Sequence, residues 1–173
     1  MSIFFDNAPA LYAKGLQVIP LQARQKKPIT AGWGAYSETK ISSEQFAQWR
    51  EEYPEGNLGC VMGRVSGVMA IDLDSLDERV IGALQDVIGH LDAPWVRVGK
   101  KGNVKLFAYN PKIRTARISA KIGEAGSDER VIELLSRGTQ IVLPPSIHPD
   151  TGLAYHANVD LADVIDACRL VRL

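Results

Sequence analysis

The chain has 173 residues, of which 46% are apolar and 23% charged, a composition typical of a folded globular domain and unlike that of disordered or fibrous chains. Its formal net charge is zero, which argues against a protein that coats duplex DNA by bulk positive charge. The two distant cysteines exclude a disulfide framework and a four-cysteine zinc site, and no apolar stretch reaches membrane-spanning length, so we expect a cytoplasmic protein without a membrane partner.

The N-terminal part is predicted to form a short helix, a strand and a long loop. Asn7 can cap a helix that Pro9 opens and that ends near Gly15. An apolar strand over residues 16–20 follows. Residues 22–40 are rich in Lys, Pro and Gly, and this composition predicts a loop.

A second helix and two strands are predicted next. Ser42 and Gln45 have the spacing of a capping box, and the helix behind them places Phe46 and Trp49 on one face. The apolar segments 57–63 and 67–74 predict two strands joined by a turn; a helix with apolar residues at helical spacing follows over residues 80–91.

The C-terminal half is predicted to be rich in hairpins. Segments 95–99 and 104–109 fit the two strands of a hairpin, residues 110–128 a basic loop, and segments 130–135 and 140–145 a second pair of strands. A turn, a short strand and a helix ending near Cys168 complete the chain. This mixture of hairpins and helices predicts an α+β domain in preference to a doubly wound parallel sheet.

The charges are segregated along the chain. Every charged residue from Val96 to Lys121 is basic, whereas acids predominate from Asp72 to Asp92. A neutral protein with this pattern can bind anions locally. A solvated basic loop explains the same pattern, and charge alone does not decide between the two.

The segment Ile71-Asp72-Leu73-Asp74 is a candidate metal site. Residues i and i+2 of a strand share a face, so the two carboxylates would project side by side, and a divalent cation would offset their repulsion. The alternative is the end of a strand leading into an aspartate-rich helix cap formed by Asp74 or Asp77.

Glu133 is the third candidate acid, because it lies within the apolar segment 130–135, where a buried carboxylate needs a partner. An edge-strand glutamate facing solvent is the alternative. Three strand-borne carboxylates suit nucleotidyl transfer: two hold the metal that binds the incoming triphosphate, and the third helps to hold the metal that activates the 3′-hydroxyl.

Basic and polar residues provide candidate nucleotide ligands. Arg97, Lys100 and Lys105 belong to the predicted hairpin and could neutralise a polyphosphate, although Gly99-Lys100-Lys101-Gly102 is not a Walker A loop. His148 follows Pro144-Pro145 in a turn, where it could bind a phosphate or simply pack, and Gln140 begins the preceding apolar strand.

Several segments, in this order, resemble the N-terminal domain of bifunctional DNA primase/polymerases of the archaeo-eukaryotic primase superfamily. The resemblance implies a two-part fold, an N-terminal α/β unit packed on a mixed sheet related to the RNA-recognition motif, with the acids in the cleft between them. The segments that carry it are Tyr12-Ala13-Lys14-Gly15, Val18-Ile19-Pro20, Lys27-Pro28, Gly32-Trp33, Trp49, Asn57-Leu58-Gly59 to Gly63, Ile71-Asp72-Leu73-Asp74, Val131-Ile132-Glu133 and Pro144-Pro145-Ser146-Ile147-His148-Pro149.

The resemblance also implies a function. Residues 1–173 would form one primase/polymerase domain, the N-terminal part of a longer primase–helicase or the partner of a separate helicase, acting in plasmid, phage or mobile-element replication. It would use nucleoside triphosphates, single-stranded DNA template and two Mg²⁺ or Mn²⁺ ions held by Asp72, Asp74 and Glu133. Lys105 stands where the family commonly has a histidine, and Glu133 where it has an aspartate. Two other readings stay open: a degenerate module that binds nucleotide or DNA without catalysis, and a metal-dependent nuclease.

Overall fold

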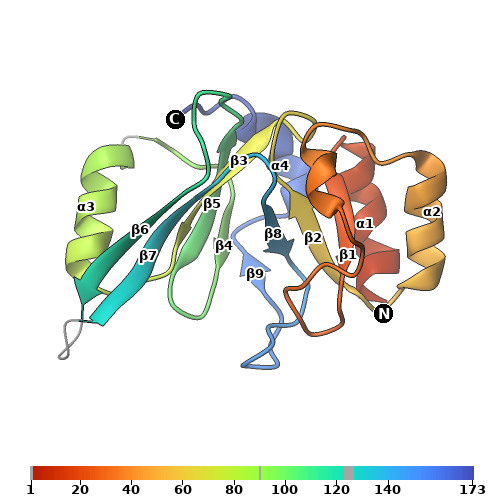
Figure 1. Cartoon of the computed structure of the whole chain (residues 1–173), viewed down its shortest axis with the longest axis horizontal. Coiled ribbons are helices and arrows are strands. Elements are labelled where there is room, and N and C mark those ends of the chain that lie inside the picture. The colour runs from red at the N-terminus through yellow and green to blue at the C-terminus, as the bar shows by residue number, and fades with distance from the viewer. Residues whose placement is uncertain (1, 90, 123–126) are drawn as a thin grey trace.

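The computed structural model describes residues 2–89, 91–122 and 127–173, and these form four α-helices and two antiparallel sheets (Figure 1). The prediction of an α+β fold is therefore confirmed. No helix in this part of the chain is long and apolar enough to cross a membrane. In chain order, the elements are α1 (Ile3–Ala13), β1 (Gln17–Leu21), the 3-10 helix η1 (Trp33–Ser37), α2 (Ser43–Glu52), β2 (Asn57–Val61), β3 (Val68–Leu73), α3 (Glu78–Ile88), β4 (Val96–Val98), β5 (Asn103–Ala108), β6 (Ala116–Ile122), β7 (Ser127–Leu135), β8 (Gln140–Leu143), β9 (His156–Ala157) and α4 (Leu161–Cys168).

The smaller sheet has the order β1-β2-β8 and the larger one the order β6-β7-β3-β5-β4-β9. The pairings between these strands are all antiparallel, so the expectation of a mixed sheet is wrong. Figure 1 shows α1 and α2 beside the smaller sheet. It shows α3 beside the larger sheet, on the side that faces away from the smaller sheet. The larger sheet is thus covered by different layers on its two faces.

The central strand β3 is apolar on both faces because each face packs on a different core. Val68 and Ala70 belong to the hydrophobic cluster shared with the smaller sheet. Met69 and Ile71 belong to a second cluster, which includes Val80 of α3. Alternation along the strand therefore places Asp72 on the face that is directed toward the smaller sheet.

The first helix begins earlier than the sequence predicts. It starts at Ile3, and Asn7 lies inside it, donating a hydrogen bond from Nδ2 to the Ile3 carbonyl at 2.8 Å rather than capping the helix. Phe4 and Leu11 are buried on its inner face. Burial of this face outweighs the hydrogen bond that Pro9 cannot donate in the middle of the helix.

Two predictions for the C-terminal half are wrong. Residues 116–122 form strand β6 rather than a loop. Most of β6 is exposed, so no apolar run in the sequence reveals this strand. Residues 123–126 of the predicted loop lie outside the described residues. Strands β7 and β8 do not pair with each other, because β7 joins β3 and β6 while β8 joins β2. The connection between them crosses from one sheet to the other.

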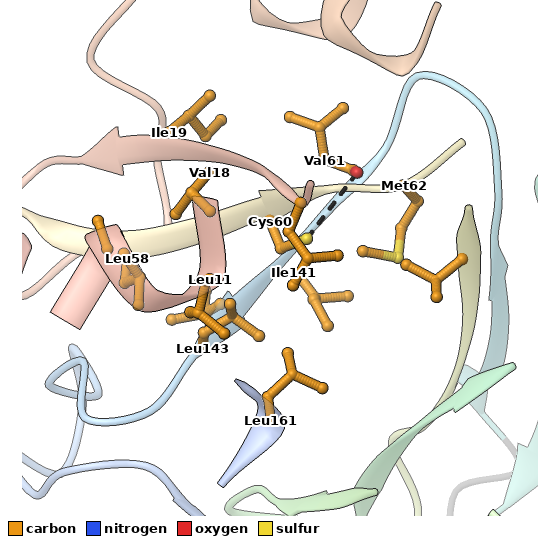
Figure 2. Close-up of a cluster of buried hydrophobic side chains, with 14 of the residues drawn as sticks. Leu11, Val18, Ile19, Leu58, Cys60, Val61, Met62, Ile141, Leu143 and Leu161 are labelled. Atoms are coloured by element: carbon orange, nitrogen blue, oxygen red, sulfur yellow. Dashed lines mark hydrogen bonds between the residues drawn. The ribbon is translucent and has the colours of Figure 1, made fainter. Parts of the chain in front are cut away.

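The smaller sheet is anchored by a cluster of side chains from α1, β1, β2, β8 and α4, shown in Figure 2. Cys60 lies in this cluster, with its Sγ 3.9 Å from the Val61 carbonyl oxygen. Burial raises the pKa of Cys60 to about 12 and that of Cys168 to about 11. Both thiols are therefore protonated and enclosed at neutral pH.

We expect neither cysteine of the native chain to react with a thiol reagent at neutral pH, because the thiolate is the reactive form and both residues are buried. The same reagent should label Cys60 and Cys168 once guanidinium chloride has unfolded the chain. Mass spectrometry of the labelled chain measures this directly. Labelling of either cysteine in the native chain at the unfolded rate would contradict the packing described here.

Candidate active site

A single row of residues crosses the larger sheet and carries most of the charged groups of the site. Arg117 of β6 pairs with Glu133 of β7, and Glu133 pairs with Asp72 of β3. Asp72 is opposite Val104 of β5, which is opposite Arg97 of β4. Directly opposed residues of an antiparallel sheet share a face, so the row presents two acids flanked by two arginines.

Asp72 and Asp74 lie at the end of β3 and line a groove between the two sheets. The groove has a volume of about 530 Å³, and its far wall is the strand β8; we call it the acid groove. Within the part of the chain that the structure describes, no hydrogen bond or ion pair involves either carboxylate. Burial raises the pKa of Asp72, an effect that Arg97 opposes and that Asp74 and Glu133 reinforce.

Glu133 lies on an interior strand rather than at a solvent-facing edge. Its side chain is 16% exposed, and its Oε1 accepts from Arg117 Nε at 2.8 Å and from Arg130 Nη1 at 3.0 Å. The third candidate acid is therefore adjacent to Asp72 in the row and is held by two guanidinium groups.

Arg97 connects the larger sheet to the smaller one. It is 8% exposed, its Nη1 donates to the Val142 carbonyl at 3.0 Å, and its guanidinium lies 4.6 Å from the centre of the Tyr155 ring. Its Nε is buried without a hydrogen-bond partner among the described residues. Arg97 thus keeps donor capacity at the edge of the acid groove.

Lys105 does not join this site, contrary to the expectation from the sequence. It is opposite Ile71 and Val96, one residue removed from Val104, so it lies on the face that α3 covers. The period of two along a strand separates it from Asp72. The sequence shows that Lys105 and its two apolar neighbours lie on opposite faces of their strand. It does not show which of these faces carries the acids of the neighbouring strands.

Lys100 and His148 both line a smaller hollow that adjoins the acid groove and shares Asp72 and Asp74 with it. Lys100 Nζ is 3.8 Å from an Asp150 carboxylate oxygen. His148 accepts the Asp150 N–H on Nδ1 at 3.1 Å, which leaves Nε2 to carry the proton, and burial lowers its pKa. A neutral His148 can therefore donate one hydrogen bond.

Close packing of the β4–β5 turn places Lys100 beside the acids. A Cβ at Gly102 would collide with the Leu73 carbonyl oxygen, so only glycine lets the turn lie against the end of β3. Gly99 N–H donates to the Gly102 carbonyl at 2.8 Å and closes the turn. The basic turn and Asp74 are thereby held next to each other.

Gln140 lines the acid groove, but its amide has a positioning contact. Its Nε2 donates to the Lys26 carbonyl at 3.0 Å and so attaches the loop after β1 to β8. Lys26 lines both hollows and was missed in the sequence, since only its place beside Lys27-Pro28 distinguished it. Arg117 and Arg130 were also missed, because nothing in the sequence shows which strand faces Glu133.

The aspartates suit a divalent cation by their chemistry. Asp72 and Asp74 are two hard oxygen donors without a protein cation bound to them, and Mg²⁺ is commonly held by one or two carboxylates together with substrate phosphates. Across residues 2–89, 91–122 and 127–173, no three acid, histidine or cysteine side chains are close enough together to hold a metal by themselves. Both arginines contact Oε1 of Glu133, so Oε2 is the oxygen that could contribute to a metal site.

The raised pKa of Asp72 predicts a gain in stability when its charge is removed. The folded state holds the Asp72 proton more tightly than the unfolded state, so this stabilising contribution is present at acidic pH and is lost as pH rises through the folded pKa. We expect Asp72→Asn to raise the free energy of unfolding at neutral pH by roughly 1 kcal/mol, or about 2–4 °C in Tm. Thermal unfolding with a chelator present measures this. Asp86→Asn, an exposed acid of α3, is the control; an Asp72→Asn variant less stable than the native chain would contradict the prediction.

Comparison with known proteins bears on the site as a whole. The model of the family described as bifunctional DNA primase/polymerase, N-terminal, matches residues 8–168. This range includes the acid groove and the hollow beside it. A search of curated proteins finds no match to the chain.

Proposed function

Since the chain belongs to the family of bifunctional DNA primase/polymerase N-terminal domains, we propose that it is a metal-dependent nucleotidyltransferase that makes or extends strands on a single-stranded DNA template. The observation that carries this proposal is the pairing of Asp72 with Glu133, with Asp74 beside them, in a groove between two sheets. Nucleotidyl transfer needs oxygen donors at one point and positive charge around them, and this groove provides both.

Asp72 and Asp74 would hold one divalent ion, and Glu133 would help to hold a second. Bound divalent ions neutralise charge on the phosphates and make the attacking 3′-hydroxyl more acidic. The chain would position the reacting groups: the rigid end of β3 fixes the two aspartates, and β7 fixes Glu133 beside them. No protein side chain is then needed as a general base.

The basic side of the smaller hollow would bind the triphosphate. Lys26, Arg97 and Lys100 line this hollow together with His148. Arginine and lysine neutralise phosphate oxygens, and the fork of Arg97 can make paired hydrogen bonds. Lys105, on the opposite face of the sheet, has no part in this proposal.

The strand order supports the relation to the RNA-recognition motif that the sequence suggested. The succession β3-α3-β4-β5, with β7 pairing beside β3, follows the first part of a β-α-β-β-α-β unit. In the chain order, strand β6 lies between β5 and β7, where that unit has its second helix. The acids then lie on the face of the central strand that the smaller sheet overhangs.

The test is incorporation of labelled nucleotides on primed and unprimed single-stranded DNA, with Mg²⁺ or Mn²⁺, analysed by product length. Extended strands or new primers are the expected result. Shortened strands would contradict the proposal and identify a nuclease. Template binding with no change in strand length would point instead to a module that binds DNA without catalysis.

A further inference from the structure

Whereas the proposed triphosphate hollow lies at the end of β3, a second basic groove lies near the start of that strand. It has a volume of about 880 Å³, and three arginines line it against a single acid. We call it the arginine groove. Its principal residues are Arg64, Arg114, Arg137, Glu38, Tyr109 and Ile113.

The arginine groove lies near the acid groove, because three segments of the chain contribute residues to both. The start of β6 contributes Thr115 to the arginine groove and Arg117 to the acid groove. The β7–β8 connection contributes Arg137 to the first and Gly138 to the second. Helix η1 begins with Trp33, which lines the acid groove, and Glu38, which lines the arginine groove, follows its end.

The arginines are held at the surface with their charge available. Arg64 donates from Nη2 to the Glu38 carbonyl at 2.7 Å and from Nε to the Glu38 carboxylate at 3.0 Å. Arg137 Nε is 3.2 Å from the other carboxylate oxygen. The side chains of Arg64 and Arg137 are 64% and 68% exposed, so an anion can reach both guanidinium groups without a change in the fold. One acid thus orients two guanidinium groups and leaves a net positive groove.

Apolar and aromatic residues also line the arginine groove. Tyr109, Pro111 and Ile113 line the groove beside Arg114. Positive charge that follows a backbone, combined with ring and aliphatic surfaces for bases, is the combination that binds single-stranded nucleic acid without sequence preference. A duplex hides its bases from such a surface, and a free triphosphate would use only part of the groove.

We infer that the arginine groove binds the phosphate backbone of the single-stranded DNA that enters the acid groove. The inference rests on the proposed function, because that function requires the bound DNA strand to enter the acid groove. Binding of DNA in the arginine groove does not itself depend on catalysis. Arg64 and Arg137 would contact phosphates, and Tyr109 would face a base. Glu38 would orient the arginines at the cost of repelling the strand.

The experiment is fluorescence anisotropy of a labelled oligothymidylate of about 16 nucleotides across a series of salt concentrations. Arg64→Ala/Arg137→Ala should weaken binding about 10-fold at moderate salt and make the log–log salt slope shallower by about 1.4, or roughly 0.7 per lost phosphate contact. Glu38→Gln should act in the opposite direction and tighten binding about threefold, because it removes a like charge while the Glu38 carbonyl still anchors Arg64.

Arg79→Ala is the matched control, because Arg79 is an exposed arginine paired with one acid at the start of α3. It should bind as the native chain does. The inference is overturned if the native chain does not bind the oligonucleotide, if the double variant keeps the native affinity and slope, if Glu38→Gln weakens binding, or if a duplex binds equally well. Nucleotide incorporation tests the proposed function separately. Salt-sensitive binding without nucleotide incorporation would support the arginine groove as a DNA-binding site and contradict the proposed function. Incorporation by the native chain, together with native DNA binding in the double variant, would contradict the arginine groove alone.

Discussion

Replacing Asp72 and Asp74 together with asparagine is expected to reduce nucleotide incorporation at least about 10³-fold, because the transition state would lose several kcal/mol of charge stabilisation. Asparagine keeps the shape of each side chain and removes the negative charge that a divalent ion needs. Because neither carboxylate has a hydrogen bond or ion pair within the described residues, the fold should survive the change. The measurement is single-turnover incorporation on primed DNA at saturating Mg²⁺.

The control for this pair is Asp86→Asn/Asp163→Asn, which removes two exposed acids from α3 and α4. It should incorporate nucleotides at the native rate, and the site variant should still bind the oligonucleotide. An active Asp72→Asn/Asp74→Asn chain would exclude the acid groove as the reaction centre. A double variant that loses DNA binding as well would show that the acids act through the fold.

Arg97→Met is expected to raise the KM for nucleoside triphosphate roughly 10- to 100-fold, because a buried guanidinium makes charge-assisted hydrogen bonds to phosphate. Methionine has a similar length and no charge, so it keeps the packing of the aliphatic part of the side chain. The change removes the contact with the Val142 carbonyl and leaves buried Asp72 without a positive charge that favours its ionised form. We therefore expect a lower Tm, and KM is measured below the unfolding range of the variant. Steady-state kinetics with varied nucleotide and saturating DNA measures the effect.

Two comparisons make the Arg97 result specific. Arg97→Lys keeps the charge and loses the fork, so its KM should lie between those of the native chain and Arg97→Met. Arg79→Met changes an exposed arginine outside the site and should leave KM unchanged. A native KM in Arg97→Met would mean that the triphosphate binds elsewhere, and an increase in the KM for DNA alone would assign Arg97 to the strand.

Local patterns predicted much of the fold because each depends on neighbouring residues. Ser42 accepts the Gln45 N–H at 3.1 Å, which is one of the two bonds of the predicted capping box, whereas the Gln45 side chain donates to Gln48. Strands β4 and β5 form the predicted hairpin. The exposed strand β6 gave no apolar signal to predict it. The short connection before Gln140 resembled a hairpin turn, but burial of β8 in the smaller sheet decided its partner.

The site depends on contacts that the sequence does not encode locally. Alternation along β3 relates Asp72 to Asp74, but only the register between β3 and β7 brings Glu133 opposite Asp72. Register also decides that Arg117 reaches Glu133 and that Lys105 faces away. These pairings join residues far apart in the chain, so they follow from how the sheet assembles as a whole.

The two arginines on Glu133 have a consequence for the order in which substrates associate. Both guanidinium groups contact Oε1 of Glu133, which occupies one carboxylate oxygen and offsets the negative charge that would hold a divalent ion. Under the proposed function, the phosphates of a bound DNA strand would compete for both guanidinium groups and would restore that charge. The affinity of the site for its second ion would then rise once the strand has bound, which favours an ordered mechanism in which DNA binds before the nucleotide.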